Sequence, residues 1–327
     1  MIRRTDSDVR NELIAAASGL TTDGVGRSDL KIAATALSDL RQAFGAYGPY
    51  RDRRKVCILG SARTASNAPA YEVARAIGEH FARRDWLVVT GAGPGIMQGA
   101  MEGAGVEHSF GVGIELPFEF LPNGVIAGDS KYVRMTHFFT RKLMLMKESV
   151  AYIALPGGFG TLDELFEIIT LIQTGKARPA PIVLLDTPGG TFWSGLQAWI
   201  TSELVGGGMV TAGDDGLYTI TDSVDTATSI VHHFYSNFQS IRDVTVADET
   251  RRIIRLRKGP SAQQLIEINS LFSAVCESGV IEIARPSDDE IADKDGLAFD
   301  RISFIFNKRR VAVLRALIDH LNGLPAV

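Results

Sequence analysis

The chain has 327 residues, 45% of them hydrophobic and 22% charged, with a formal net charge of −4 and a sequence pI near 5.9. This composition is typical of a soluble protein with a sizeable core, and the acidic balance argues against nucleic acid as a partner. We expect no membrane span and no secretory signal, because apolar runs are short and the N-terminus is polar. Cys57 and Cys276 suggest neither a disulfide framework nor a metal site, so we expect a cytoplasmic protein.

Residues 1–50 are expected to form an N-terminal helical segment. Two short helices between residue 7 and about residue 47 flank a glycine-containing break at residues 24–26. The second has apolar residues at helical spacing: Leu30, Ala33, Ala34, Leu37, Leu40, Ala43 and Phe44. The charged stretch 51–55 that follows is interpreted as a solvated approach to the first buried strand.

Residues 51–240 alternate between apolar strand-like runs and amphipathic helical runs. Strands are expected at 56–59, 86–90, 110–116, 150–155 and 182–186, with a weaker one at 217–220. Helices are expected near 69–83, 96–105, 138–147, 162–173, 192–204 and 224–238. This order predicts an α/β domain with a Rossmann-like, doubly wound parallel sheet and helices on both faces. Such sheets bind ligands at the carboxyl ends of their strands.

Residues 241–327 have a different pattern. We expect a strand at 252–257, a helix at 262–276, strands at 280–284 and 301–306, and a helix at 309–321. This β-α-β-β-α order predicts a small α+β domain of ferredoxin-like type, with an acidic loop at 288–295. No catalytic constellation lies in it. A regulatory or oligomerising role and a structural cap remain alternatives.

Two glycine-containing turns follow the first two strands. The first contains Gly60 and Ser61, whose hydroxyl can donate to a phosphate. The second, residues 90–97, approximates the dinucleotide fingerprint but has Ile96 where the third glycine belongs. Glu115, at the end of the next strand, can mimic the ribose-binding acid, so a nicotinamide enzyme stays open as an alternative. A mononucleotide phosphate or ribose loop fits the second turn better.

The third turn, with the sequence PGGFGTLDE over residues 156–164, is the most informative feature of the chain. Its glycines allow close approach of the backbone to a ligand, and the N–H groups at a helix start favour an anion such as phosphate. Glu164 follows in the first turn of the helix, beside the predicted phosphate pocket. The simpler interpretation is a tight connection without a ligand. Three glycines and Thr161 favour chemistry on a phosphorylated small molecule.

These motifs resemble the Lonely Guy (LOG) family of nucleoside 5′-monophosphate phosphoribohydrolases, some of which were mislabelled as lysine decarboxylases. The family motif P-G-G-x-G-T-x-x-E is matched in full by Pro156, Gly157, Gly158, Gly160, Thr161 and Glu164. Arg141 and Lys142 match an upstream Arg-Lys pair, and residues 90–97 resemble the family's second glycine loop. The resemblance covers roughly residues 55–238 and is to a long bacterial form with a C-terminal extension.

The resemblance implies hydrolysis of the N-glycosidic bond of an AMP-like nucleotide to a free base and ribose 5-phosphate. The substrate is either a cytokinin precursor or an ordinary purine or pyrimidine nucleotide. The resemblance implies Arg141 and Glu164 as catalytic residues, no cofactor, no metal, and a homodimer or higher homo-oligomer. The expected substrate-binding residues are Gly60, Ser61, Gly91, Gly93, Gly95, Met97, Asn123, Lys142, Pro156, Gly157, Gly158, Gly160, Thr161 and Thr170.

Two of these residues are assigned by the resemblance alone. Asn123 stands where plant-type members have a substrate-contacting glutamate, so the base preference is open. Thr170 stands where the family has a substrate-contacting threonine.

Three other functions remain as alternatives. The first is a nucleotide- or cofactor-binding protein without catalysis, a carrier or a sensor, since molybdenum-cofactor carriers share the glycine turn. The others are a nicotinamide-dependent oxidoreductase and a pyridoxal-phosphate decarboxylase with a Schiff-base lysine. The presence of both Arg141 and Glu164 favours the hydrolase.

Overall fold

The computed structural model describes residues 5–115, 121–211, 213–246 and 249–324. Its larger sheet has seven parallel strands in the order β4-β3-β2-β1-β5-β6-β7. The strands are β1 Lys55–Leu59, β2 Leu87–Thr90, β3 Ser109–Ile114, β4 Tyr132–Met135, β5 Ala151–Ala154, β6 Ile182–Leu185 and β7 Tyr218–Thr221. The central strands β1, β2, β5 and β6 are buried along their whole length, which explains their continuous apolar sequences.

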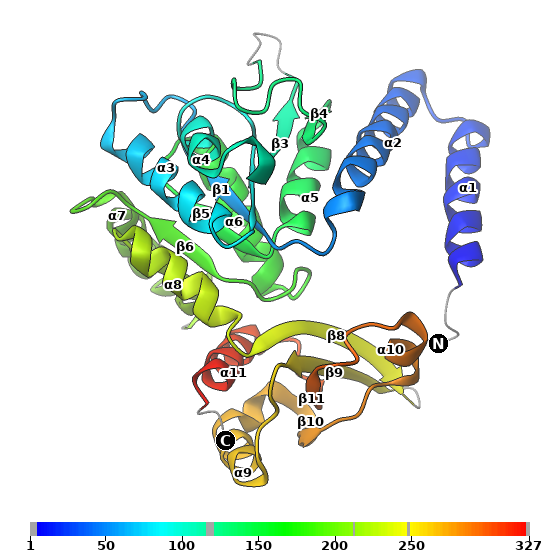
Figure 1. Cartoon of the computed structure of the whole chain (residues 1–327). Helices are drawn as coiled ribbons and strands as arrows, with labels where there is room; N and C mark the ends of the chain where they lie inside the picture. The colour runs from blue at the N-terminus through cyan, green and yellow to red at the C-terminus, as the bar shows by residue number, and fades with distance from the viewer. Residues whose placement is uncertain (1–4, 116–120, 212, 247–248, 325–327) are drawn as a thin grey trace.

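Helices cover both faces of this sheet, so the doubly wound α/β fold is confirmed (Figure 1). The helices are α3 Pro69–Ala82, α4 Ile96–Ala104, α5 Phe138–Glu148, α6 Phe159–Gln173, α7 Phe192–Trp199 and α8 Val224–Phe234. Helices α3 and α4 pack closely, because a side chain on Gly78 or Gly103 would overlap the backbone of the other helix. No helix among the described residues is long and apolar enough to cross a membrane.

The structure corrects several expected elements. Strand β4 was not predicted, because it is an edge strand whose exposed Arg134 interrupts the apolar run. Helix α6 begins at Phe159 rather than at residue 162, since its first turn contains glycine instead of periodic apolar residues. The helix expected at 192–204 is α7 followed by a π-helical turn at Ile200–Val205. The strand expected at 110–116 ends at Ile114, and residue 116 lies outside the described residues.

The two predicted N-terminal helices are present as α1 Asp6–Thr22 and α2 Arg27–Tyr47. Helix α2 packs beside α5 and β4 at one edge of the sheet (Figure 1). Helix α1 stands apart from the rest of the chain, and every one of its residues is at least partly exposed. The N-terminal segment thus contacts the body mainly through α2.

The C-terminal region contains a four-stranded antiparallel sheet in the order β10-β11-β9-β8. Its elements are β8 Phe238–Val246, β9 Glu249–Leu256, α9 Ala262–Phe272, β10 Cys276–Ile283, α10 Asp288–Asp293, β11 Asp300–Phe306 and α11 Val311–Gly323. The predicted β-α-β-β-α elements are present as β9, α9, β10, β11 and α11, with helix α10 added between β10 and β11. Strand β11 lies between β9 and β10, as in a split β-α-β unit.

Strand β8 and helix α10 were missed by the sequence analysis. Strand β8 precedes the predicted elements in the sequence and pairs antiparallel with β9 as the fourth, outer strand of the sheet. It escaped detection because the pairing shifts register between Phe238 and Ser240, which breaks the apolar alternation. Helix α10 occupies the segment expected to be an acidic loop.

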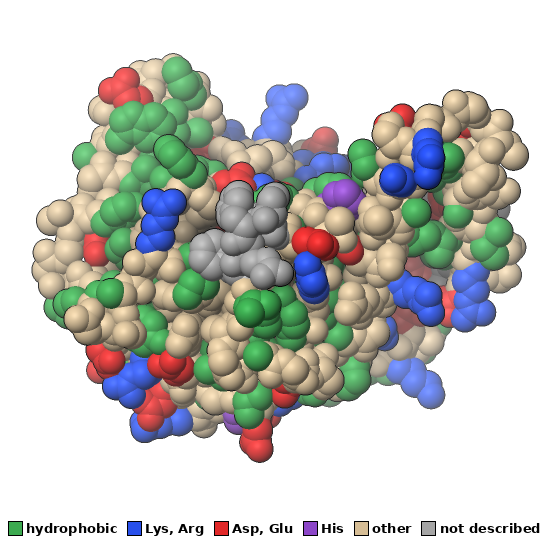
Figure 2. Space-filling view, turned by 90° about the horizontal axis from the view of Figure 1, so that it is seen from above, with side chains coloured by type: hydrophobic (Ala, Val, Ile, Leu, Met, Phe, Trp, Pro, Cys, Tyr) green, Lys and Arg blue, Asp and Glu red, His purple; other side chains and the backbone are tan. Residues whose placement is uncertain are grey.

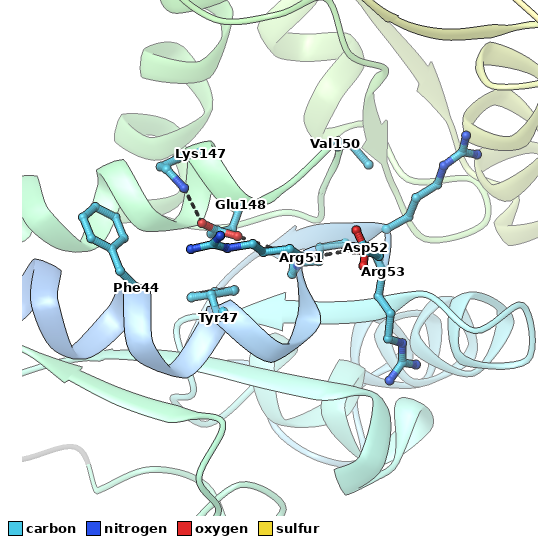
Figure 3. Close-up of a pocket in the computed structure, with 11 residues that line it drawn as sticks. Phe44, Tyr47, Arg51, Asp52, Arg53, Lys147, Glu148 and Val150 are labelled. Atoms are coloured by element: carbon cyan, nitrogen blue, oxygen red, sulfur yellow. Dashed lines mark hydrogen bonds and ion pairs between the residues drawn. The ribbon is translucent and has the colours of Figure 1, made fainter. Parts of the chain in front are cut away.

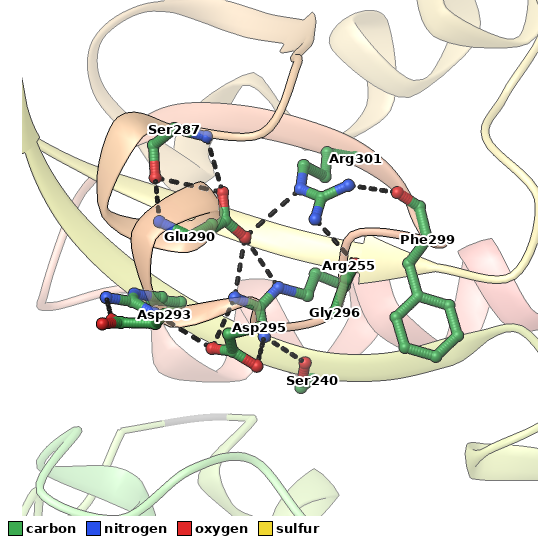
Figure 4. A network of polar contacts seen from close by, with 10 residues as sticks. Ser240, Arg255, Ser287, Glu290, Asp293, Asp295, Gly296, Phe299 and Arg301 are labelled. Carbon is green, nitrogen blue, oxygen red and sulfur yellow. Dashed lines mark hydrogen bonds and ion pairs between the residues drawn. The ribbon is translucent and has the colours of Figure 1, made fainter.

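The acidic segment contributes to a buried ion network on the C-terminal sheet (Figure 4). The Glu290 side chain is fully buried and lies 2.7 Å from Arg255 Nη2 and 3.2 Å from Arg301 Nε. The N–H and hydroxyl of Ser287 donate to its other oxygen. Asp295 accepts from Arg255 at 2.8–3.0 Å and pairs with Arg242 at 3.0 Å. The network fastens the α10 segment to strands β8, β9 and β11.

Glu290→Gln is expected to lower the free energy of unfolding by about 3–5 kcal/mol at pH 7, because it leaves the buried Arg301 guanidinium without a carboxylate and Arg255 with Asp295 alone. Burial opposes ionisation of Glu290, but the Ser287 N–H and the Arg255 guanidinium outweigh burial and lower its pKa below 4.5. The stabilisation is therefore complete at neutral pH and is lost as the pH falls through the lowered pKa. Urea unfolding at a series of pH values measures both effects.

The control for this variant is Glu282→Gln, which removes a carboxylate 58% exposed and paired with Arg251. It should change the stability by less than about 1 kcal/mol. A Glu290→Gln loss that stayed constant from neutral to strongly acidic pH would contradict the assigned charge state.

Candidate functional site

The three predicted turns meet at the edge of the parallel sheet where the strands end. The Ser61 N–H donates to the Pro156 carbonyl at 3.3 Å, and the Ile96 N–H donates to the Ser61 carbonyl at 3.0 Å. These two bonds join the turns that follow β1, β2 and β5. Figure 2 looks down on this side of the molecule, where acidic and basic side chains lie close together near the middle. The predicted convergence of the glycine turns is therefore observed.

Glycine is required in the second turn for two physical reasons. Gly95 has φ +67°, and a side chain there would lie 2.4 Å from the Ser61 carbonyl oxygen. Gly91 lies directly beneath the Arg141 guanidinium, because a Cβ at this position would be 2.0 Å from Arg141 Nη2. Met97 packs over the same turn, 2.7 Å from the place of a Cβ on Gly93. The second turn thus forms a floor under Arg141.

The third turn leaves the start of α6 open. Gly158 is the N-cap residue, and no side chain caps the helix. A Cβ on Gly157 would overlap Thr161 Oγ1 at 2.2 Å, whereas a Cβ on Gly158 or Gly160 would meet no atom within 4 Å. The first N–H groups of a helix lack intrahelical acceptors. The space before Gly158 and Gly160 is therefore both free of side chains and suited to an anion.

Arg141 and Glu164 form an ion pair next to these turns. Arg141 Nη1 lies 3.1 Å from Glu164 Oε1, and the two side chains are 11% and 14% exposed. Arg141 Nε also donates to the Val112 carbonyl at 3.0 Å, which fixes the guanidinium against β3. Because α5 supplies the arginine and α6 the glutamate, the pair joins two neighbouring helices. The two residues share one site, as their assigned roles require.

The environment of Glu164 is largely apolar on its inner side. A small internal space is lined by Glu164 together with Cys57, Leu59 and Ile168. Burial raises the pKa of the Glu164 carboxyl above its ordinary value, and the Arg141 charge opposes this rise. Arg141 is thus the main group that favours the ionised form of this buried carboxyl.

The remaining predicted residues have different surroundings. Lys142 Nζ lies 2.7 Å from Asp163 and 2.8 Å from Glu167, so it links α5 to α6 beside the Arg141–Glu164 pair. The Asn123 side-chain amide donates to the carbonyls of Ala92 and Gly93, both at 3.1 Å, and supports the second turn from within. Their roles as substrate contacts stay predictions.

Thr170 is exposed on α6, six residues beyond Glu164, and no described contact joins it to the three turns. Its assigned contact with substrate also stays a prediction. Glu115, the acid of the nicotinamide alternative, pairs with Arg134 at 3.0 Å on the surface. Among the described residues, no group of three or more His, Cys, Asp or Glu side chains is placed to hold a metal ion.

The sequence analysis missed one residue that supports the site. Asp39 of α2 is buried and accepts hydrogen bonds from the N–H groups of Thr136 and His137 and from the hydroxyls of Thr136 and Thr140. It therefore anchors the segment that leads into α5, the helix that carries Arg141, and places a negative charge near the start of that helix. The available signal was a carboxylate in the apolar stripe of α2, where Leu40 and Ala43 face the core.

Comparison with known proteins identifies the family. The family model described as possible lysine decarboxylase matches residues 95–231, a span that includes Arg141 and Glu164. A cytokinin riboside 5′-monophosphate phosphoribohydrolase from Mycobacterium marinum is 34% identical over 158 residues, and the match covers 48% of this chain and 82% of that protein. The chain belongs to the LOG family. The resemblance drawn from the turn motif and the Arg-Lys pair is thereby confirmed.

Other relatives match the same part of the chain. Two probable cytokinin riboside 5′-monophosphate phosphoribohydrolases from Oryza sativa subsp. japonica are 34% and 33% identical, over 44% and 45% of this chain. The chain spans 62% and 59% of the length of these two relatives. Among solved structures, a molybdenum cofactor binding protein from Rippkaea orientalis aligns with 55% of this chain and 96% of its own at 17% identity, with a TM-score of 0.39.

Gly160→Ala is expected to leave the fold intact and to weaken phosphate binding. The added methyl group meets no protein atom, and alanine favours the helix over glycine by about 1 kcal/mol. The methyl group instead enters the free space at the start of α6. We expect at least about tenfold weaker binding of ribose 5-phosphate by calorimetry, with an unchanged or raised unfolding temperature. Unchanged affinity would place the phosphate elsewhere.

Proposed function

We propose that this LOG-family chain hydrolyses the N-glycosidic bond of a nucleoside 5′-monophosphate and releases the free base and ribose 5-phosphate. The observation that carries the proposal is the buried Arg141–Glu164 pair beside the uncapped start of α6. An anion-binding helix terminus and a buried carboxylate one turn away suit a substrate with a phosphate at one end of a sugar. The names of the M. marinum and rice relatives support the same reaction.

The proposed substrate orientation follows from the geometry of the turns. The 5′-phosphate takes the N–H groups at the start of α6, in the space before Gly158 and Gly160. The ribose then lies over the second turn, near Gly91 and Met97, with C1′ toward Glu164. Phe159, which is 94% exposed at the first position of α6, stands at the rim of this space.

The proposed chemistry uses the charge state of Glu164. As the C1′–N bond breaks, C1′ gains positive charge, which an adjacent carboxylate stabilises. A water molecule forms the new C1′–O bond as the C1′–N bond breaks, and one of its protons passes to Glu164. The Glu164 carboxyl then releases a proton to the departing base, which regenerates the carboxylate. Arg141 favours the ionised form of Glu164 before the reaction and orients it through a guanidinium that is itself held by the Val112 carbonyl.

Glu164→Gln is expected to lower kcat by about 10²- to 10⁴-fold while KM changes little, because the carboxylate acts mainly in the transition state. The assay is chromatography of the free base released from AMP, GMP, CMP, UMP and an N6-modified AMP. The matched control is Glu167→Gln, one turn further along α6, which removes a carboxylate that pairs only with Lys142 in the described structure.

The panel also separates the alternatives. Wild-type turnover in Glu164→Gln on the best nucleotide would refute the assigned role of Glu164. Binding of nucleotides by the wild type without release of any base would support the carrier or sensor instead. The nucleotide with the highest kcat/KM defines the base preference.

We further propose that the functional unit is a homodimer formed through α5. Phe138, Phe139 and Leu143 are 55%, 56% and 44% exposed on the helix that also carries Arg141. Large apolar side chains that cluster on a surface are typical of a protein interface. Light scattering should give twice the 35.4-kDa mass of one chain, and Phe139→Glu should give a single chain. A wild type that remained a monomer at micromolar concentration would disprove this interface.

A further inference from the structure

A second cavity, of about 610 Å³, lies at the end of the parallel sheet where the strands begin, opposite the end that carries the glycine turns. Its walls come from the end of α5, the segment 171–180 that leads from α6 to β6, and the start of β8. It therefore lies where the parallel sheet meets the C-terminal sheet. Its volume is in the range of small-molecule sites in proteins.

The charged side chains that line this cavity all have the same sign. They are Arg54, Lys147, Lys176 and Arg178, and no described residue in the lining is Asp or Glu. Lys147 is paired with Glu148 at 2.5 Å, and Arg54 donates to the neutral amide of Gln239 at 3.0 Å.

The other two cations carry uncompensated charge. Lys176 and Arg178 are exposed at the cavity mouth and have no described carboxylate within ion-pair distance. Since the walls include Leu143, Leu171 and Phe238, an apolar space is bordered by uncompensated positive charge.

A buried polar group in the same lining lacks a partner. Ser149 is 7% exposed, and its hydroxyl is buried and forms no hydrogen bond with any described residue. Buried hydroxyls in folded proteins are nearly always satisfied. The unpaired Ser149 hydroxyl and the two cations Lys176 and Arg178 are independent observations. Each favours a ligand that is rich in hydrogen-bond acceptors.

A neighbouring cavity of about 490 Å³ makes the contrast clear (Figure 3). It shares Arg54 and Lys147 with the larger cavity, but Asp52 and Glu148 also line it. Its Lys55 lies 4.0 Å from Glu148. Arg51 and Arg53 line it as well, so its lining is also positive overall. Part of that charge is paired within the chain, because Lys147 pairs with Glu148 and Arg53 pairs with Asp85. The larger cavity differs in that no described carboxylate lies in its lining.

We propose that the larger cavity binds a small organic anion that combines an apolar ring or chain with a phosphate or carboxylate group. The Arg178 guanidinium and the Lys176 ammonium would bind the oxyanion, and the Ser149 hydroxyl would donate to a polar atom further inside. The apolar part would lie against Met146, Leu171 and Phe238.

The position of this site connects it to the candidate active site. Leu143 and Lys147 lie on α5, downstream of Arg141, and Leu171 lies on α6, downstream of Glu164. An occupant therefore contacts the far ends of both helices that supply the ion pair, and it also contacts β8 of the C-terminal sheet. The site is suited to a ligand that reports on, or alters, the relative placement of α5 and α6.

The test uses the fluorescent aromatic sulfonate 8-anilinonaphthalene-1-sulfonate as a probe on the full chain, with ribose 5-phosphate present to occupy the glycine-turn site. The double variant Lys176→Glu/Arg178→Glu should bind the probe about tenfold more weakly or worse, because it loses two charge-assisted contacts. The control Lys308→Glu/Arg309→Glu makes the same change of charge on an exposed loop of the C-terminal region and should bind as the wild type does.

Competition then identifies the oxyanion. Displacement of the probe by ATP but not by 1-naphthoate assigns a phosphate ligand, and the reverse result assigns a carboxylate. Equal probe affinity in the wild type and in Lys176→Glu/Arg178→Glu would overturn the proposal, as would the absence of displacement by both competitors. Thermal unfolding of both variants verifies that they are folded. None of these readouts depends on hydrolysis.

Discussion

A carboxylate buried against an apolar wall needs a compensating charge, and in this chain one guanidinium supplies it. Glu164 sits among Cys57, Leu59 and Ile168 on its inner side, and Arg141 is the cation that pairs with it. Arg141 can reach that position only because Gly91 has no side chain and because the Val112 carbonyl accepts from its Nε. The second turn, strand β3 and the helices α5 and α6 are thus all required by a single ion pair.

Much of the fold could be predicted because burial leaves a direct trace in the sequence. Strands β1, β2, β5 and β6 are covered on both faces, so their residues are almost all apolar. Strand β4 is at an edge, and strand β8 has an irregular register, so neither has a regular apolar pattern. Both were missed for that reason.

The site could be predicted where backbone geometry demands a residue type. Gly95 needs a positive φ and Gly91 must admit a guanidinium, and both glycines lie in a recognisable motif. Side-chain partners are a different matter, since residues far apart in sequence make them. The hydrogen bonds from Asn123 to the second turn and from α5 to Asp39 depend on the folded arrangement. No local pattern specifies such long-range partners.

The hydrogen bonds that Asp39 accepts at the start of α5 connect the N-terminal segment to the candidate site. Helix α2 lies outside the parallel sheet, yet its Asp39 carboxylate accepts hydrogen bonds from His137 and Thr140 at the start of the helix that carries Arg141. Fraying of α2 would break the hydrogen bonds of Asp39 with the start of α5. Arg141 would then be held less firmly beside Glu164. The N-terminal segment is thus tied to the helix that carries Arg141, and substitutions along residues 27–47 can reach the Arg141–Glu164 pair through α5.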